Sequence, residues 1–101
     1  FEQPHGLSVT DKAYRSPHPE FKNLQWAYPL GWPPLQMVAV EGLDRYGFHD
    51  EAGRVGRRFV GLMLDQYAET GKLWEKYNVV TGGLEFPVER YPTVPFHGWS
   101  S

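Results

Sequence analysis

The sequence predicts an all-α fold in which one helical hairpin is flanked by long ordered loops. Two segments, residues 34–46 and about 50–70, carry apolar residues at helical spacing and are joined by a short turn. Such a connection places consecutive helices antiparallel. The flanking segments are rich in proline, glycine and aromatic residues and show no helical period, so we expect loops there.

Residues 1–33 are predicted to be loop, and the most informative motif, residues 25–34, covers the end of this loop and the first helical position. Three prolines, at positions 29, 33 and 34, accompany Gln25, Trp26 and Trp32, and proline fixes φ and stiffens the backbone. A rigid loop that presents indole faces and an amide suits a sugar-binding site, because sugar CH faces stack on aromatic rings. A proline-rich corner whose tryptophans fill a core is the alternative, and the chemistry alone leaves the two even.

The first helix should open at Pro34, since proline is well suited to the first helical position. Apolar residues occupy most of its sides: Leu35, Met37, Val38, Ala39, Val40 and Leu43. A helix of this kind is normally buried on most sides, so we expect it to be the more buried of the two. Because one partner helix cannot cover that much apolar surface, we also expect this chain to depend on further polypeptide.

The second helix follows a stop at Gly47 and should be capped by Asp50 and ended by Gly71. Its inner stripe is predicted to hold Val55, Phe59, Leu62, Met63 and Tyr67. The opposite side carries charged residues and is most simply a solvated face.

Two glutamates in the segment after Lys72 are candidate functional residues. Glu75 lies between Trp74 and Tyr77, and aromatic neighbours favour a ligand site, whereas pairing with Lys72 or Lys76 would make Glu75 an ordinary surface residue. Glu85 follows two glycines, which allow backbone to lie close to a ligand, although a turn residue is the alternative there.

Composition excludes several classes of function. The chain has 101 residues, a net charge of −2 and no cysteine, so disulfide and thiol chemistry are excluded, and nucleic acid and anionic membranes are poor partners. No apolar run approaches the roughly 20 residues of a membrane span. The histidines show no metal-ligand spacing, and we expect neither a metal nor a cofactor. A cytoplasmic location is slightly favoured, and the start at Phe1 suggests a piece of something longer or a processed chain.

The proline-rich motif resembles the second signature of the α,α-trehalases, Gln-Trp-Asp-x-Pro-x-Gly-Trp-x-Pro. The matching positions are Gln25, Trp26, Pro29, Gly31, Trp32 and Pro34. Residues 3–7, 35–47, 71–79, 82–87 and 96–100 are also similar to trehalase segments, in the same order along the chain. Ala27 replaces the signature aspartate, and Leu30 stands where trehalases commonly carry asparagine, which puts strict trehalose specificity in doubt.

The resemblance implies that residues 1–101 are a C-terminal segment of an (α/α)6 barrel, contributing one inner and outer helix and loops over the barrel mouth. It implies inverting hydrolysis of an α-glucosidic bond, with Glu75 as general base, Glu85 as the second candidate for that role, and a general acid outside this chain. Gln25, Trp26, Trp32, Glu85 and Trp99 would bind the sugar, with Phe96 beside Trp99. The expected partners are therefore the sugar substrate and the rest of the barrel. A non-catalytic carbohydrate-binding or structural fragment is the alternative.

Overall fold

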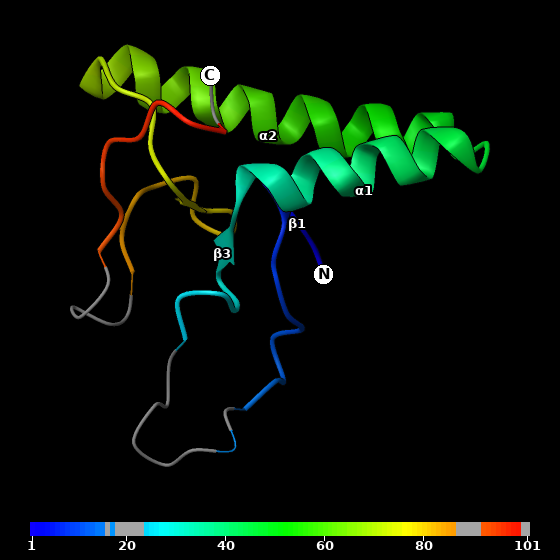
Figure 1. Ribbon diagram of the computed structural model, residues 1–101, viewed down its shortest axis with the longest axis horizontal. Coiled ribbons are helices and arrows are strands. Elements are labelled where there is room, and N and C mark those ends of the chain that lie inside the picture. The colour runs from blue at the N-terminus through cyan, green and yellow to red at the C-terminus, as the bar shows by residue number, and fades with distance from the viewer. Residues whose placement is uncertain (16, 18–23, 87–91, 100–101) are drawn as a thin grey trace.

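The computed structural model describes residues 1–15, 17, 24–86 and 92–99. Two helices, α1 (Pro33–Arg45) and α2 (His49–Thr70), lie side by side, and the loop segments extend from one end of the pair (Figure 1). Parts of both predicted loops, residues 16, 18–23, 87–91 and 100–101, lie outside the described residues.

Helix α1 begins where the sequence predicts, to within one residue. Trp32 precedes it with extended backbone (φ −115°, ψ 132°), and Pro33 and Pro34 occupy the first two helical positions. Proline lacks an N–H, and the first N–H groups of a helix have no partner inside it, so nothing is lost there. The helix ends before Gly47, whose φ of 88° suits glycine.

Helix α2 also matches its predicted bounds, but its first turn differs from the prediction. Phe48 is the residue before the helix and gives no side-chain cap, while Asp50 lies inside the first turn with Glu51. In the first turn, both carboxylates interact favourably with the positive end of the helix dipole. Gly71 ends the helix in the left-handed conformation, as predicted, and its N–H donates to the Tyr67 carbonyl at 2.7 Å.

The prediction of an all-α fold is wrong, because the chain also forms two small antiparallel sheets. Strand β1 (Glu2–Gln3) pairs with β2 (Gly6–Leu7), and β3 (Leu30–Gly31) pairs with β4 (Tyr77–Asn78). Each strand has only two residues, too few to display the alternating pattern that identifies a strand in a sequence. One hairpin with two small sheets does not form a barrel, so the predicted barrel architecture is not seen in this chain.

The hydrophobic core lies between α2 and strand β4. Phe59 and Leu62 from α2 pack with Tyr77 and Val79, and all four are buried. The Phe59 and Tyr77 rings meet edge to face, with centroids 5.6 Å apart, a favourable aromatic geometry. The predicted inner stripe of α2 is therefore largely confirmed, except that Tyr67 is exposed and Gln66 is buried in that turn.

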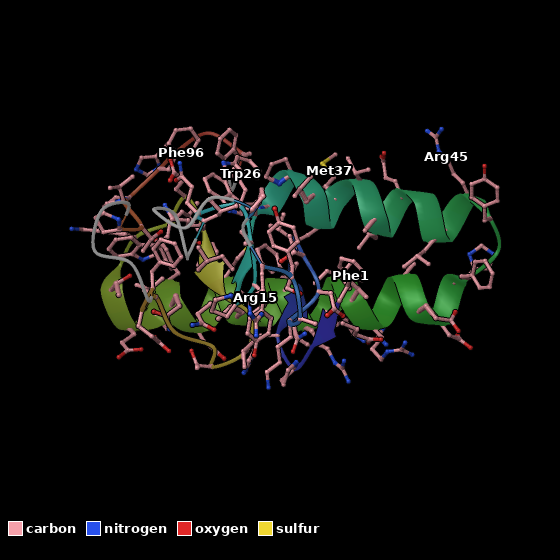
Figure 2. The ribbon with its side chains drawn as sticks, turned by 90° about the horizontal axis from the view of Figure 1, so that it is seen from below. Phe1, Arg15, Trp26, Met37, Arg45 and Phe96 are labelled. Atoms are coloured by element: carbon pink, nitrogen blue, oxygen red, sulfur yellow. The ribbon has the colours of Figure 1, made fainter. Side chains whose placement is uncertain are left out.

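The expectation that the first helix is the more buried one is wrong for this chain. Helix α2 buries five residues, whereas α1 buries only Pro33 and Gln36. Met37 and Val38 are 65% and 67% exposed, and Met37 points away from α2 (Figure 2). The reason is that α2 covers one side of α1, and no other described segment covers the opposite side.

Gln36 ties α1 to the first sheet through both ends of its side-chain amide. Its Oε1 accepts from the Leu7 N–H at 2.8 Å, and its Nε2 donates to the Leu7 carbonyl at 2.6 Å. Gln36 is buried, and a buried amide needs such partners to offset the loss of water. The N-terminal hairpin is thereby fixed against the start of α1.

We expect Gly31→Ala to destabilise the protein by about 1–3 kcal/mol, the usual cost of overpacking. A Cβ at Gly31 would overlap Val79 and lie 2.9 Å from the Leu7 carbonyl oxygen and 3.0 Å from Gln36 Nε2. Unfolding by urea, measured in the natural polypeptide that carries this chain, tests the expected loss of stability. Gly61→Ala is the matched control, since a Cβ there meets nothing within 4 Å in this chain. Equal stability of both variants would contradict the prediction.

Candidate functional site

The pairing of β3 with β4 brings the proline-rich motif beside the segment that contains Glu75. Leu30 pairs with Asn78 and Gly31 with Tyr77, and the Val79 N–H donates to the Pro29 carbonyl at 3.1 Å. Residues separated by about half the chain are thus held at hydrogen-bonding distance. The two regions that sequence analysis singled out therefore belong to one site.

Four aromatic residues gather there, and we call Trp26, Trp32, Phe96 and Trp99 the aromatic cluster. Trp26 and Trp32 are stacked, with centroids 3.7 Å apart and ring planes 11° apart. Trp99 lies 5.9 Å from Trp32 and 4.6 Å from Phe96 between ring centroids. Figure 2 shows Trp26 and Phe96 at the same end of the molecule.

The tryptophans differ in what they can offer a ligand. Trp32 is buried, and its indole N–H donates to the Gln25 carbonyl at 2.8 Å. Trp26 and Trp99 are 43% and 44% exposed. The buried Trp32 thus packs against two tryptophans that remain accessible. Within the motif, Trp32 fills a core position and Trp26 faces outward, and the sugar-binding role stays a prediction.

Glu75 lies directly against this cluster. The indole N–H of Trp99 donates to the Glu75 carbonyl at 3.1 Å, and the Glu75 N–H donates to the Val94 carbonyl at 2.9 Å. An isolated bridge between Trp74 and Pro95 fixes the same two segments together. The Glu75 side chain keeps 23% exposure, so its carboxylate is partly accessible.

Lys76 is the residue that sequence analysis underestimated. It is 1% exposed, yet its Nζ donates to Glu75 Oε1 at 2.8 Å and to the Pro92 carbonyl at 3.2 Å. The ammonium also lies 5.1 Å from the centroid of the Trp32 ring. Glu75 is therefore paired with Lys76, but the pair is part of the aromatic site and not a solvated surface pair.

The backbone around Lys76 is fixed by a threonine that the sequence did not single out. The Lys76 N–H donates to Thr93 Oγ1 at 3.2 Å, and that hydroxyl donates to the Lys76 carbonyl at 2.7 Å. Thr93 thereby replaces a strand partner for this residue. The hydroxyl carries no local pattern that would have revealed its role, since its partner is 17 residues away.

Glu85 stands in a different environment from Glu75. The Thr81 hydroxyl donates to Glu85 Oε1, and this bond, with the N–H groups of Glu85 and Leu84, lowers the pKa of the carboxyl, while burial opposes the shift. Glu85 is therefore ionised at neutral pH. Its backbone carbonyl accepts from Asn78 Nδ2 at 3.2 Å, which links the Glu85 turn to β4.

The two departures from the trehalase signature both fall at buried positions. Ala27 and Leu30 are 7% and 1% exposed, so neither side chain faces the accessible side of the aromatic cluster. Gln25 is half-buried and contributes its backbone carbonyl to Trp32. A polar residue at position 27 or 30 would thus act on the packing beneath the site.

Two further structural findings concern metals and membranes. Among residues 1–15, 17, 24–86 and 92–99, no group of three or more acidic or histidine side chains lies close enough together to hold a metal ion. Neither described helix combines the length and apolar character that a membrane crossing requires.

Comparison with known proteins identifies the family. The family profile described as trehalase matches residues 3–100. The chain is 38% identical to a periplasmic trehalase of Pseudomonas aeruginosa over 98% of its own length and 17% of the relative's. It is 37% identical to a periplasmic trehalase of Salmonella paratyphi B over 98% of its length and 16% of that relative.

Two consequences follow from these relatives. The chain spans about a sixth of the length of the curated relatives it matches. The preference for a cytoplasmic location is wrong, because the relatives are named for the periplasm. With a family match across nearly all of its residues, this chain belongs to the trehalase family.

Proposed function

We propose that this chain contributes to a glycoside hydrolase that cleaves the α-glucosidic bond of trehalose or a related α-glucoside. The observation that carries the proposal is the partly exposed side chain of Glu75 at the aromatic cluster: its backbone carbonyl accepts from Trp99, and its carboxylate pairs with the Lys76 ammonium beside the Trp32 ring. A carboxylate next to exposed indole faces combines the two things that sugar hydrolysis requires, a proton-transfer group and a platform for the ring. Membership of the trehalase family supports the choice of substrate.

In the proposed mechanism Glu75 acts as general base and the reaction inverts the anomeric carbon. An inverting enzyme uses one carboxylate to activate water and one carboxylic acid to protonate the leaving oxygen. We assign the first role to Glu75 and the second to an acidic residue outside this chain. The two carboxyls should lie roughly 6.5–9.5 Å apart, which leaves room for the water.

Sugar binding is assigned to the residues around Glu75. Trp26 and Trp99, the exposed members of the aromatic cluster, would stack on sugar faces, and Trp32 would hold Trp26 in place. The ionised carboxylate of Glu85 would accept hydrogen bonds from sugar hydroxyls, and the Gln25 amide would add a further polar contact. This division gives Glu75 the chemical step and the other residues the positioning.

We further propose that residues 1–101 form a segment of a larger catalytic domain located in the periplasm. Relatives of about six times the length support the first part, and their names support the second. The exposed apolar residues of α1, including Met37 and Val38, would then be covered by the rest of that domain. The remaining polypeptide is accordingly the principal protein partner.

Hydrolysis of trehalose by the natural polypeptide that carries this chain tests the function. We expect the first product molecules, observed by proton NMR before mutarotation, to be α-glucose and β-glucose in equal amounts. Inversion converts the attacked unit to the β anomer, while the leaving unit stays α; retention would give α-glucose alone. Trehalose that binds without being cleaved would overturn the catalytic proposal and favour a carbohydrate-binding role.

A further inference from the structure

We propose that Lys76 is a positioning residue for Glu75, fixing one carboxylate oxygen so that the other can receive the proton of the attacking water. The inference rests on the proposed function of Glu75 as general base. It goes beyond that function by assigning a role in the reaction to a neighbouring residue and a separate task to each oxygen of the carboxylate.

The ammonium of Lys76 is held by its surroundings and not by solvent. The residue is 1% exposed, and its Nζ is fixed by Glu75 Oε1 at 2.8 Å and by the Pro92 carbonyl at 3.2 Å. The Trp32 ring lies 5.1 Å away and attracts the cation with its π face. An ammonium with these neighbours has little freedom to move.

Without a partner, the Glu75 carboxylate would not be held well enough for proton transfer. The Glu75 side chain is 23% exposed and has several rotatable bonds, so its position depends on what it contacts. A charge-assisted hydrogen bond from a fixed ammonium is stronger and shorter than a neutral one. Because Lys76 occupies Oε1, we assign the contact with water to Oε2.

The presence of a cation at this buried position points to a role for its charge. Burying an ammonium is unfavourable unless it is paired and hydrogen-bonded, and an apolar side chain would fill the same space without that cost. The Thr93 hydroxyl also binds both the N–H and the carbonyl of Lys76. Several groups thus converge to keep one ammonium beside one carboxylate.

Lys76→Met in the natural polypeptide tests the role, because methionine keeps most of the length of the side chain and removes the charge. We expect kcat for trehalose to fall by about 10²-fold, because a small misplacement of a reacting group can lower the rate by that factor. KM should change by less than about threefold. Lys72→Met is the matched control: it removes the same charge from an exposed residue in the same segment. It should leave kcat unchanged.

A rescue experiment separates the charge from the filling of space. Lys76→Ala should regain part of its kcat when propylammonium is added, whereas propanol, of similar size and uncharged, should restore none. Equal rescue by both would show that Lys76 only fills a cavity and would overturn the proposal. If Lys76→Met does not fold, Lys76→Gln replaces it, with the same expected loss of kcat at nearly constant KM.

The outcomes for this proposal and for the proposed function are distinct. An active wild type that loses activity in Glu75→Gln but keeps it in Lys76→Met would overturn the role of Lys76 and leave the function intact. A wild type that cleaves neither trehalose nor related α-glucosides would overturn both. Loss of kcat in Lys76→Met with charge-specific rescue of Lys76→Ala would establish the role.

Discussion

Glu75→Gln is expected to lower kcat for trehalose hydrolysis by about 10²-fold or more, while sugar binding survives. Glutamine keeps the shape of the side chain and its ability to accept from the Lys76 ammonium, but it cannot take a proton from water. Steady-state kinetics measures kcat, and quenching of tryptophan fluorescence by trehalose measures binding, since Trp26 and Trp99 are accessible.

Two further variants show whether the effect belongs to Glu75. Glu85→Gln should raise KM as well as lower kcat, because we assign Glu85 to sugar binding. Glu69→Gln, at an exposed position near the end of α2, should behave as wild type. Near-full hydrolysis of trehalose by Glu75→Gln would show that the general base has been assigned to the wrong residue.

Phe59→Ala is expected to have the largest effect on stability, a loss of about 3–5 kcal/mol in the free energy of unfolding. Phe59 is buried in the core and packs edge to face on Tyr77, so truncation leaves a cavity beneath strand β4. Urea unfolding of the natural polypeptide measures this loss in the free energy of unfolding. Because β4 directly follows Lys76, we also expect weaker sugar hydrolysis well below the unfolding midpoint.

Arg57→Ala is the control for that variant. Arg57 lies on the exposed side of the same helix, where substitutions usually change stability by no more than about 0.5 kcal/mol. If Phe59→Ala lowered the free energy of unfolding no more than Arg57→Ala, the core between α2 and β4 would not govern stability.

The helices were predictable because their signals are local. Apolar spacing, Pro33 and Pro34 at one start, and Gly71 at one end set the bounds of α1 and α2 within a residue or two. The two sheets were not predictable, since each strand has two residues and its partner is chosen by tertiary contacts. The prediction of which helix is more buried failed for a related reason. The apolar sides of α1 show how much surface it needs to bury, but not whether this chain contains the segments that would cover it.

The candidate site was predictable only where its residues belong to sequence motifs. Trp26, Trp32, Trp99 and Glu75 come together in the structure, whereas the roles of these residues, of Gln25 and of Glu85 stay predictions. Lys76 was considered only as a partner for a surface glutamate. Its hydrogen bonds to Pro92 and Thr93 involve residues much later in the chain, so the sequence around Lys76 does not reveal them.

The amide of Gln36 also stands in for a backbone partner of the first sheet. Leu7 stands opposite Glu2 in the first sheet, and its N–H and carbonyl, which Gln36 occupies, are the pair that another strand would otherwise bind. An open strand edge is a template for association between chains. One side chain thus takes the place of a neighbouring strand and leaves neither backbone group of Leu7 open to pairing with another chain.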